Sequence, residues 1–174
     1  MYRIGQRRKP DPAPVEQTAA PVPPVGDRVQ HEALFRNLDT DALTGLASVG
    51  QLGVRLNEMY EHCAALGVRP SNSFALFVME PDFGNRSPLV RDASRVLIAD
   101  EISRTFQHGE TLAVSGERFI VLAANTPGFS RACTSMVDRL LQIPAVKNAD
   151  ITGWMEPLPD KQVDVSRFVL ELAF

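Results

Sequence analysis

Cysteine, tryptophan and long apolar runs are all scarce in this sequence. Its 174 residues include two cysteines and one tryptophan. Cys63 and Cys133 are far apart and form no CxxC pair, so we expect buried free thiols, without a disulfide or a cysteine metal site. The longest apolar runs, such as residues 119–124, are too short to cross a bilayer, so no membrane span is predicted. These observations favour a reducing, cytoplasmic location.

An excess of basic charge is also missing. Eighteen lysines and arginines stand against 21 aspartates and glutamates, which gives a formal net charge of −3. This balance argues against a nucleic-acid binder that uses a basic patch. The sequence contains no glycine-rich phosphate loop, no serine–histidine–aspartate set and no cysteine–histidine metal spacing. With 44% hydrophobic and 22% charged residues, the chain has the composition of a globular domain of ordinary size plus a tail.

The first 30 residues differ from the rest of the chain. Six of the 13 prolines lie between Pro10 and Pro24, and most residues between them are small or polar. Proline has no amide donor, and few large apolar side chains are available here, so this stretch cannot build a core. We therefore predict a disordered proline-rich tail or linker at residues 1–30 and a single domain at residues 31–174.

The remainder of the sequence alternates between helical and strand patterns. Ser48 is placed to cap a helix and Gly67 to end it. Two short apolar runs on either side of residues 115–118 predict a hairpin. The order of elements predicts an α/β or α+β fold, with helices packed on a sheet. The spacing predicts helices over 31–38, 48–66, 89–107, 130–141 and 166–174, strands over 73–80, 111–114, 119–124 and 150–155, and a turn-rich connection over 81–88.

Three segments carry a family resemblance, in the same order as in the family. Residues 41–46 (DALTGL) match a DxLTGL turn, and residues 75–83 resemble a strand that ends in DxDxF. Residues 109–122 resemble the stretch around a GGDEF motif, with SGERF in its place, and residues 151–154 add a weaker likeness. The chain thus resembles a degenerate GGDEF (diguanylate-cyclase-like) domain over about residues 31–160, and the ordered set is more specific than any single segment.

Intact members of this family join two GTP molecules into cyclic di-GMP, with two subunits meeting face to face. The resemblance implies a nucleotide-cyclase-like fold with a central, mainly antiparallel sheet flanked by helices. A 3′-hydroxyl must attack an α-phosphorus, so the family's site needs a divalent cation to neutralise the triphosphate and to help ionise the hydroxyl. Magnesium prefers carboxylate oxygens, and the paired glycines let the backbone approach the nucleotide.

The matching positions of this chain keep part of that site and alter the rest. Glu80 and Glu117 keep carboxylates at the two metal-binding places, whereas Arg118 replaces an acid with a cation. Beside a divalent ion at ~4 Å, that swap is unfavourable by several kcal/mol at an effective dielectric near 20. We therefore expect no catalysis and no cofactor, with magnesium present only if nucleotide binding is retained. The residues of this vestigial site are Glu80, Asp82, Ser115, Gly116, Glu117 and Arg118.

Arg118 has two interpretations. We expect it to pair with Glu117, Glu80 or Asp82, because such an ion pair leaves no buried carboxylate without a partner. In the alternative, Arg118 and Gly116 contact a nucleotide, or Arg118 holds an acidic partner. The family's RxxD product site is replaced by residues 107–110 (QHGE), so tight binding of cyclic di-GMP there is not expected.

The sequence thus predicts a catalytically inactive regulatory or scaffold domain. We expect it to act through protein–protein contact, as a homodimer or with another protein, in a bacterial signalling or secretion-related pathway. Two alternatives are a sensor that binds GTP or cyclic di-GMP without turnover, and a divergent but active diguanylate cyclase.

Overall fold

The structure, a computed structural model, describes residues 39–161. The predicted tail at 1–30, the predicted helix at 31–38 and the predicted last helix at 166–174 lie outside these residues. No helix within residues 39–161 has both the length and the apolar character that crossing a membrane requires. The elements in chain order are α2 (Val49–Leu66), α3 (Pro70–Ser73), β1 (Phe74–Asp82), α4 (Pro88–Thr105), β2 (Thr111–Ser115), β3 (Arg118–Ala124), α5 (Pro127–Leu140) and β4 (Asp150–Pro157).

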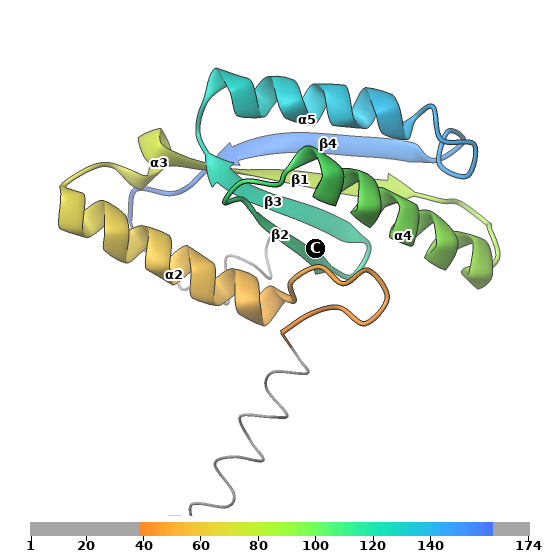
Figure 1. Cartoon of the computed structure of the whole chain (residues 1–174), viewed down its shortest axis with the longest axis horizontal. Coiled ribbons are helices and arrows are strands. Elements are labelled where there is room, and N and C mark those ends of the chain that lie inside the picture. The colour runs from red at the N-terminus through yellow and green to blue at the C-terminus, as the bar shows by residue number, and fades with distance from the viewer. Residues whose placement is uncertain (1–38, 162–174) are drawn as a thin grey trace, which may run out of the picture.

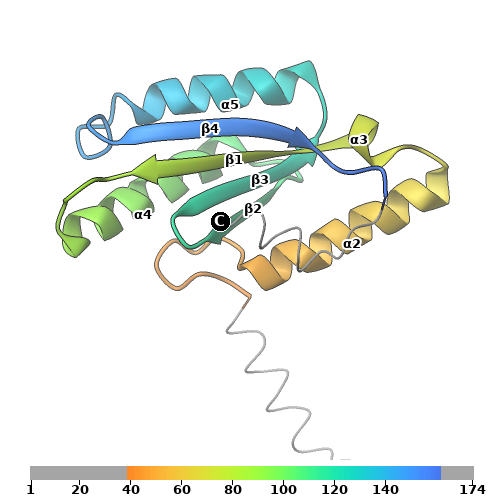
Figure 2. The same cartoon turned by 180° about the vertical axis from the view of Figure 1, so that it is seen from behind.

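The four described strands form one sheet in the order β2-β3-β1-β4. Every neighbouring pair is antiparallel, and β1 lies in the interior between β3 and β4. Helices α4 and α5 cover one face of the sheet, and α2 covers the other (Figures 1 and 2). The predicted fold, an antiparallel sheet flanked by helices, is confirmed.

Alternation along the strands divides the apolar side chains between two cores. On the side of α4 and α5, the buried group includes Phe119 of β3 and Ile98 of α4. On the side of α2, Leu52 and Leu56 pack against sheet residues such as Leu122. Burying side chains of this size stabilises a fold by about 1.5–3 kcal/mol each. Strand β3, which begins at the hairpin, is therefore held from both faces.

Helix α2 begins and ends as the sequence predicts. The Ser48 hydroxyl accepts a hydrogen bond from the Gln51 amide at 3.3 Å, which caps the first turn. Gly67 follows the last turn with a φ of +64°, and the Val68 amide donates to the Cys63 carbonyl at 3.0 Å. This closure is a Schellman-type cap, which requires a left-handed residue at the position of the glycine.

Gly67→Ala is expected to lower the free energy of unfolding by about 1 kcal/mol, because an L side chain is strained at this positive φ. Gly50→Ala, in the first turn of the same helix, is the matched control. A Cβ at Gly50 would meet only the Ser48 hydroxyl, at 3.6 Å, so alanine there is expected to stabilise the helix by about 0.5–1 kcal/mol. Urea unfolding of both variants measures these changes, and shifts of the same sign would contradict the assignment.

Several element boundaries, and one whole element, differ from the sequence prediction. Strand β1 continues through Pro81 to Asp82, because the pairing with β3 ends at Met79 and a proline is tolerated where one side of a strand has no neighbour. Helix α5 begins at Pro127, three residues earlier than predicted, since Thr126 caps it and proline suits a first helical position. The single turn α3 was not predicted.

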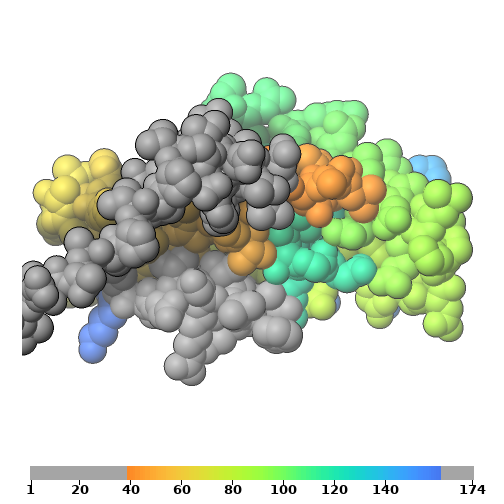
Figure 3. Space-filling view, turned by 90° about the horizontal axis from the view of Figure 1, so that it is seen from below, coloured from red at the N-terminus to blue at the C-terminus, as the bar shows by residue number. Residues whose placement is uncertain are grey.

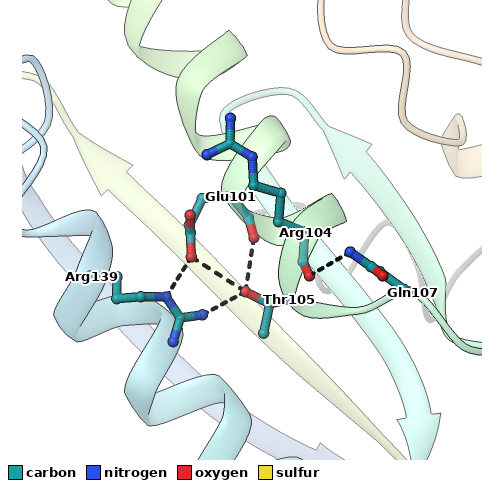
Figure 4. A network of polar contacts seen from close by, with 5 residues as sticks. All are labelled: Glu101, Arg104, Thr105, Gln107 and Arg139. Atoms are coloured by element: carbon teal, nitrogen blue, oxygen red, sulfur yellow. Dashed lines mark hydrogen bonds and ion pairs between the residues drawn. The ribbon is translucent and has the colours of Figure 1, made fainter.

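A polar network joins α4 to α5 (Figure 4). Arg139 Nε donates to Glu101 Oε1 at 2.6 Å, and Arg139 Nη2 donates to Thr105 Oγ1 at 2.7 Å. The Thr105 hydroxyl donates in turn to the Glu101 backbone carbonyl at 2.8 Å. Because the arginine side chain is about half exposed, its ion pair contributes little to stability, on the order of 1 kcal/mol or less. The network nevertheless fixes the end of α4 against α5.

Candidate functional site

The β2–β3 hairpin is closed by a two-residue turn. Ser115 pairs with Arg118 across it, and Gly116 and Glu117 form the turn itself. Gly116 has a φ of +58° at the first central position, where glycine is favoured in type II′ hairpins. The only glycine of the SGERF segment therefore stands where the backbone requires one, and Ser115 lies at the end of β2.

Arg118 pairs with Glu80 on the α2 face of the sheet. Arg118 Nε lies 2.9 Å from Glu80 Oε2, and Arg118 Cζ lies 5.8 Å from the centre of the Trp154 ring. Glu80 follows Met79 on β1 and Arg118 precedes Phe119 on β3, so in this antiparallel pairing the two charged residues lie side by side next to the Met79–Phe119 pair. The side chain of Arg118 is 13% exposed and that of Glu80 is 43% exposed. The ion pair between them, one of the pairings predicted for Arg118, is confirmed.

Glu117 pairs with an arginine of helix α4 and does not share Arg118 with Glu80. Its Oε1 lies 2.6 Å from Arg91 Nη2, and one turn along the helix Arg95 Nη2 donates to the Gly116 carbonyl at 2.9 Å. Sequence reasoning missed both of these arginines. The signal that could have identified them is their i, i+4 spacing, which places Arg91 and Arg95 on the same side of a helix. Two arginines of α4 thus hold the tip of the hairpin.

The two motif carboxylates do not converge on one point. Glu80 forms an ion pair with Arg118, and Glu117 forms one with Arg91. Asp82 Oδ1 accepts a hydrogen bond from the Gly84 amide at 2.8 Å in a local turn. In the part of the chain that the structure describes, no group of three histidine, cysteine, aspartate or glutamate side chains is placed to hold a metal ion. The arrangement is a set of ion pairs around a hairpin, with guanidinium groups where carboxylates would face a cation.

The loop that precedes α2 lies beside the hairpin. Asp41 Oδ1 accepts hydrogen bonds from the Thr44 amide at 2.8 Å and from its hydroxyl at 2.7 Å. Ala47 then joins β2, since its amide donates to the Leu112 carbonyl at 2.9 Å and its carbonyl accepts the Val114 amide at 3.0 Å. In Figure 3 this loop, the hairpin and α4 lie next to one another on one surface.

Asp41 makes the stability of this loop depend on pH. Burial alone would raise the pKa of the Asp41 carboxyl. The hydrogen bonds from Thr44 and the positive charge of Arg95 together outweigh that effect, so the pKa lies below its usual value. A carboxyl whose pKa is lowered by folding stabilises the fold above its unfolded pKa, near 3.9, and that contribution is lost as the pH falls through the folded pKa.

We therefore expect Asp41→Asn to make unfolding less dependent on acid. The stability gap between the unsubstituted protein and this variant should shrink between about pH 6 and about pH 3, because only the unsubstituted protein loses a charged acceptor. Urea unfolding at a series of pH values measures the gap. The matched control is Asn57→Ala on the exposed surface of α2, which removes no titratable group, so its gap should stay constant. A constant gap for both variants would contradict the role of Asp41.

Comparison with known proteins shows which solved structures this fold resembles. The sequence matches no family profile and no curated protein at a significant level. Solved structures do match: the GGDEF domain with coiled coil of DgcB from Caulobacter crescentus, in complex with c-di-GMP, has a TM-score of 0.62 at 14% identity, over 84% of this chain and 82% of that chain. The FimX GGDEF domain from Pseudomonas aeruginosa has a TM-score of 0.56 at 15% identity, over 78% of this chain and 88% of that chain.

A third match is an enzyme described with its activator. Diguanylate cyclase SiaD from Pseudomonas aeruginosa, in complex with its activator SiaC, has a TM-score of 0.55 at 18% identity. The match covers 85% of this chain, which spans 65% of the SiaD chain. The β2–β3 hairpin of this chain falls at the GGDEF position of the sequence resemblance. The fold of this chain is therefore that of a GGDEF domain.

Proposed function

We propose that this chain is a cytoplasmic GGDEF-like domain without cyclase activity, which acts by contact with protein in a bacterial cyclic di-GMP signalling pathway. One observation carries the proposal: Glu80 and Glu117, the two candidate metal carboxylates, are each paired with a different arginine. The signalling context is taken from similar structures, of which one holds c-di-GMP and another an activator protein. The buried free thiols fit a reducing compartment.

The charges around the hairpin disfavour a divalent cation. Phosphoryl transfer of the cyclase type uses the cation to neutralise the triphosphate, so carboxylates must face it. A guanidinium at about 4 Å from such an ion repels it by several kcal/mol at an effective dielectric near 20. Arg118 is already in contact with Glu80, so an entering cation would have to displace a mostly buried arginine.

Incubation of the full chain with GTP and magnesium or manganese tests the absence of catalysis. We expect no cyclic di-GMP by liquid chromatography, at enzyme concentrations where an intact diguanylate cyclase converts all of its substrate. Accumulation of cyclic di-GMP would instead establish a divergent active cyclase. The proposal that the domain lacks catalysis would then be wrong, whatever the chain contacts.

Arg118→Glu is expected to create magnesium binding. The substitution places a second carboxylate beside Glu80, so the two acids repel one another until a divalent cation lies between them. Magnesium should therefore raise the Tm of this variant and leave the Tm of the unsubstituted protein unchanged. Calorimetric titration with magnesium gives the affinity directly.

The control for this prediction is Arg131→Glu, which makes the same charge change on the exposed surface of α5. Magnesium should not change the Tm of that control. If magnesium stabilises neither variant, the positions of the two acids are wrong for a cation, and the metal site of the family is not latent in this pocket. If it stabilises the unsubstituted protein, the charge argument fails.

A second candidate function is a metal-independent anion sensor, and Arg95 favours it. Within residues 39–161 the buried Arg95 Nε has no hydrogen-bond partner. Both Arg91 and Arg95 contact the hairpin beside it. Guanidinium groups bind phosphates well, so the hairpin could accept a nucleotide phosphate through Arg118 and Gly116. Titration with GTP and with cyclic di-GMP, each with and without EDTA, decides: binding that survives EDTA establishes the sensor, and no heat with either ligand excludes it.

A further inference from the structure

The outer edge of β4 has no neighbour in the part of the chain that the structure describes. Strand β4 ends the sheet and pairs only with β1 (Figures 1 and 2). The Leu158 amide continues that pairing, since it donates to the Phe74 carbonyl at 3.2 Å. Bonding alternates along an antiparallel pair, so the odd-numbered residues of β4 turn their backbone groups away from β1. The amides of Ile151, Gly153 and Met155 therefore point outward, without a backbone partner among residues 39–161.

This edge lacks the usual protection of an outer strand. An open edge can pair with any extended segment, and proteins commonly protect it with lysine, with proline or with a covering segment. On the opposite edge of the sheet, Ala47 provides such cover, because its amide and its carbonyl both bond to β2. Strand β4 has eight residues without lysine or arginine, and its one proline, Pro157, is the last of them. The edge is therefore able to accept another strand.

An open cavity lies beside this edge, between β4 and α5. Its volume is about 260 Å³, and its lining includes Phe77, Val137 and Ile151. Gly153 also lines the cavity and keeps it open, because a Cβ at this position would lie 2.9 Å from Phe77 Cζ. A large side chain on a neighbouring strand can fill the space beside an edge glycine. The cavity therefore favours a segment with a large apolar residue opposite Gly153.

The charges beside the edge are acidic. Asp150 and Glu156 are the only charged residues of β4, and Asp138 of α5 lines the cavity. None of these three acids forms an ion pair within residues 39–161. Asp150 also lies directly opposite Asp82 of β1, and like charges in such a cross-strand pair are destabilising. A segment that adds to β4 should therefore carry basic side chains.

We infer that residues 2–9 of the same chain (YRIGQRRK) add to the outer edge of β4 as an antiparallel strand. This segment holds four of the 18 basic residues of the chain and no acid. It contains no proline, so every residue keeps its backbone donor. In an extended chain, Tyr2 and Ile4 lie on one side and Arg3 and Arg7 on the other. The segment thus combines the apolar and the basic side chains that the edge calls for.

One register satisfies both the cavity and the charges. Ile4 lies opposite Gly153, so its side chain enters the space that the glycine leaves. In the antiparallel direction, Arg7 then lies opposite Asp150 on the other face of the sheet. A cation at that place offsets the repulsion between Asp150 and its like-charged neighbour on β1.

The connection to the described domain is long enough for this pairing. Residues 10–38 form the connection, and a chain of about 30 residues spans about 30 Å as a flexible coil and about 90 Å as an extended polyproline helix. A domain of this size has a radius of gyration of about 14 Å, so β4 is within reach. A tether also gives the segment an effective concentration of up to about millimolar, which permits pairing that is weak between separate molecules. Strand β1 separates β4 from the hairpin strands, so the inference does not depend on the absence of cyclase activity.

Cross-linking tests the register. Gly5 would lie opposite Thr152 in a pair without backbone hydrogen bonds, where Cα atoms are about 4.5 Å apart, within the range of a disulfide. Gly5→Cys combined with Thr152→Cys in the full chain should therefore form an intramolecular disulfide on mild oxidation. The native thiols do not compete, because Cys63 and Cys133 are buried, as predicted, and burial raises the pKa of Cys133 to about 12.

The matched control combines Gly5→Cys with Val54→Cys, at a position that is 52% exposed on α2. This pair should oxidise at least about tenfold more slowly, because the tether alone brings the two thiols together only at random. Equal rates for the two pairs overturn the inference. So does a cross-link that forms only between chains, which would make a second copy the occupant of the edge.

Charge reversal gives an independent readout. Arg7→Glu should make the outward amide of Gly153 exchange its hydrogen at least about tenfold faster, as followed by NMR, because the covering strand leaves the edge. Asp150→Arg should have the same effect, and the two substitutions together should restore slow exchange. Arg28→Glu makes the same charge change within residues 10–38 and should leave the rate unchanged. Fast exchange in the unsubstituted chain overturns the inference, as does a rate that Arg7→Glu does not alter.

Discussion

Phe119→Ala is expected to lower the free energy of unfolding by about 3–5 kcal/mol. Phe119 is 1% exposed and follows Arg118 at the start of β3. It pairs with Met79 on β1 and with Val114 on β2, so its ring fills the core where three strands meet beneath α4. Alanine would leave a cavity there that the surrounding strands cannot close, since their own residues are held in the sheet.

Urea unfolding followed by far-UV circular dichroism measures this loss. The control is Val54→Ala, at a position that is 52% exposed on α2, where the change should stay within about 0.5 kcal/mol. If the alanine variant does not fold, Phe119→Leu should fold with a smaller loss, because it removes less volume. A cost below about 1 kcal/mol for Phe119→Ala would mean that the core on this face is not packed as described.

Leu56→Ala is expected to cost about 2–5 kcal/mol, and to act on the opposite face of the sheet. Leu56 is fully buried and, with Leu52, attaches α2 to Leu76 and Leu122. Among residues 39–161, α2 is the only long helix on this face, whereas α4 and α5 share the other. The loss should therefore appear first as loosening of α2, with less effect on the packing of α4 and α5.

Trp154, the only tryptophan of the chain, is placed to report this loosening. It packs against the core on the α2 side and lies next to Arg118, so its fluorescence should respond to Leu56→Ala before unfolding begins. Cys133 belongs to the other core, and its protection from thiol reagents should persist in native buffer. Equal exposure of both probes would show that the two faces unfold as one unit and contradict the separation.

Local sequence signals were sufficient for most of the fold. Ser48 and Gly67 mark the ends of α2 because capping depends on side chains within one turn of the helix end. The hairpin was predictable because Gly116 separates two short apolar runs. Strand β1 was predicted too short because Pro81 is a stop signal only in a strand that has neighbours on both sides, and that depends on where β3 ends.

The site was predictable only in part, for the same kind of reason. Charge alone predicted that Arg118 would pair with one of the nearby acids, and the structure shows that this acid is Glu80. Which acid it takes depends on strand register, and the register leaves Glu117 to Arg91. Nothing local in the chain links a residue of α4 to a hairpin tip 26 positions further on. That contact exists only once the helix has packed on the sheet.

The interior position of β1 also sets an order of events during synthesis. Its residues leave the ribosome before either neighbour, and β4, which pairs with it from Ala75 to Asp82, ends only at Pro157. At about 5–20 residues per second, the apolar run of β1 waits on the order of 4–15 s for that partner. Pairings this distant in sequence close slowly, and an unpaired apolar strand is a site for aggregation meanwhile. Nascent chains are therefore most exposed to misassembly between the completion of β1 and that of β4.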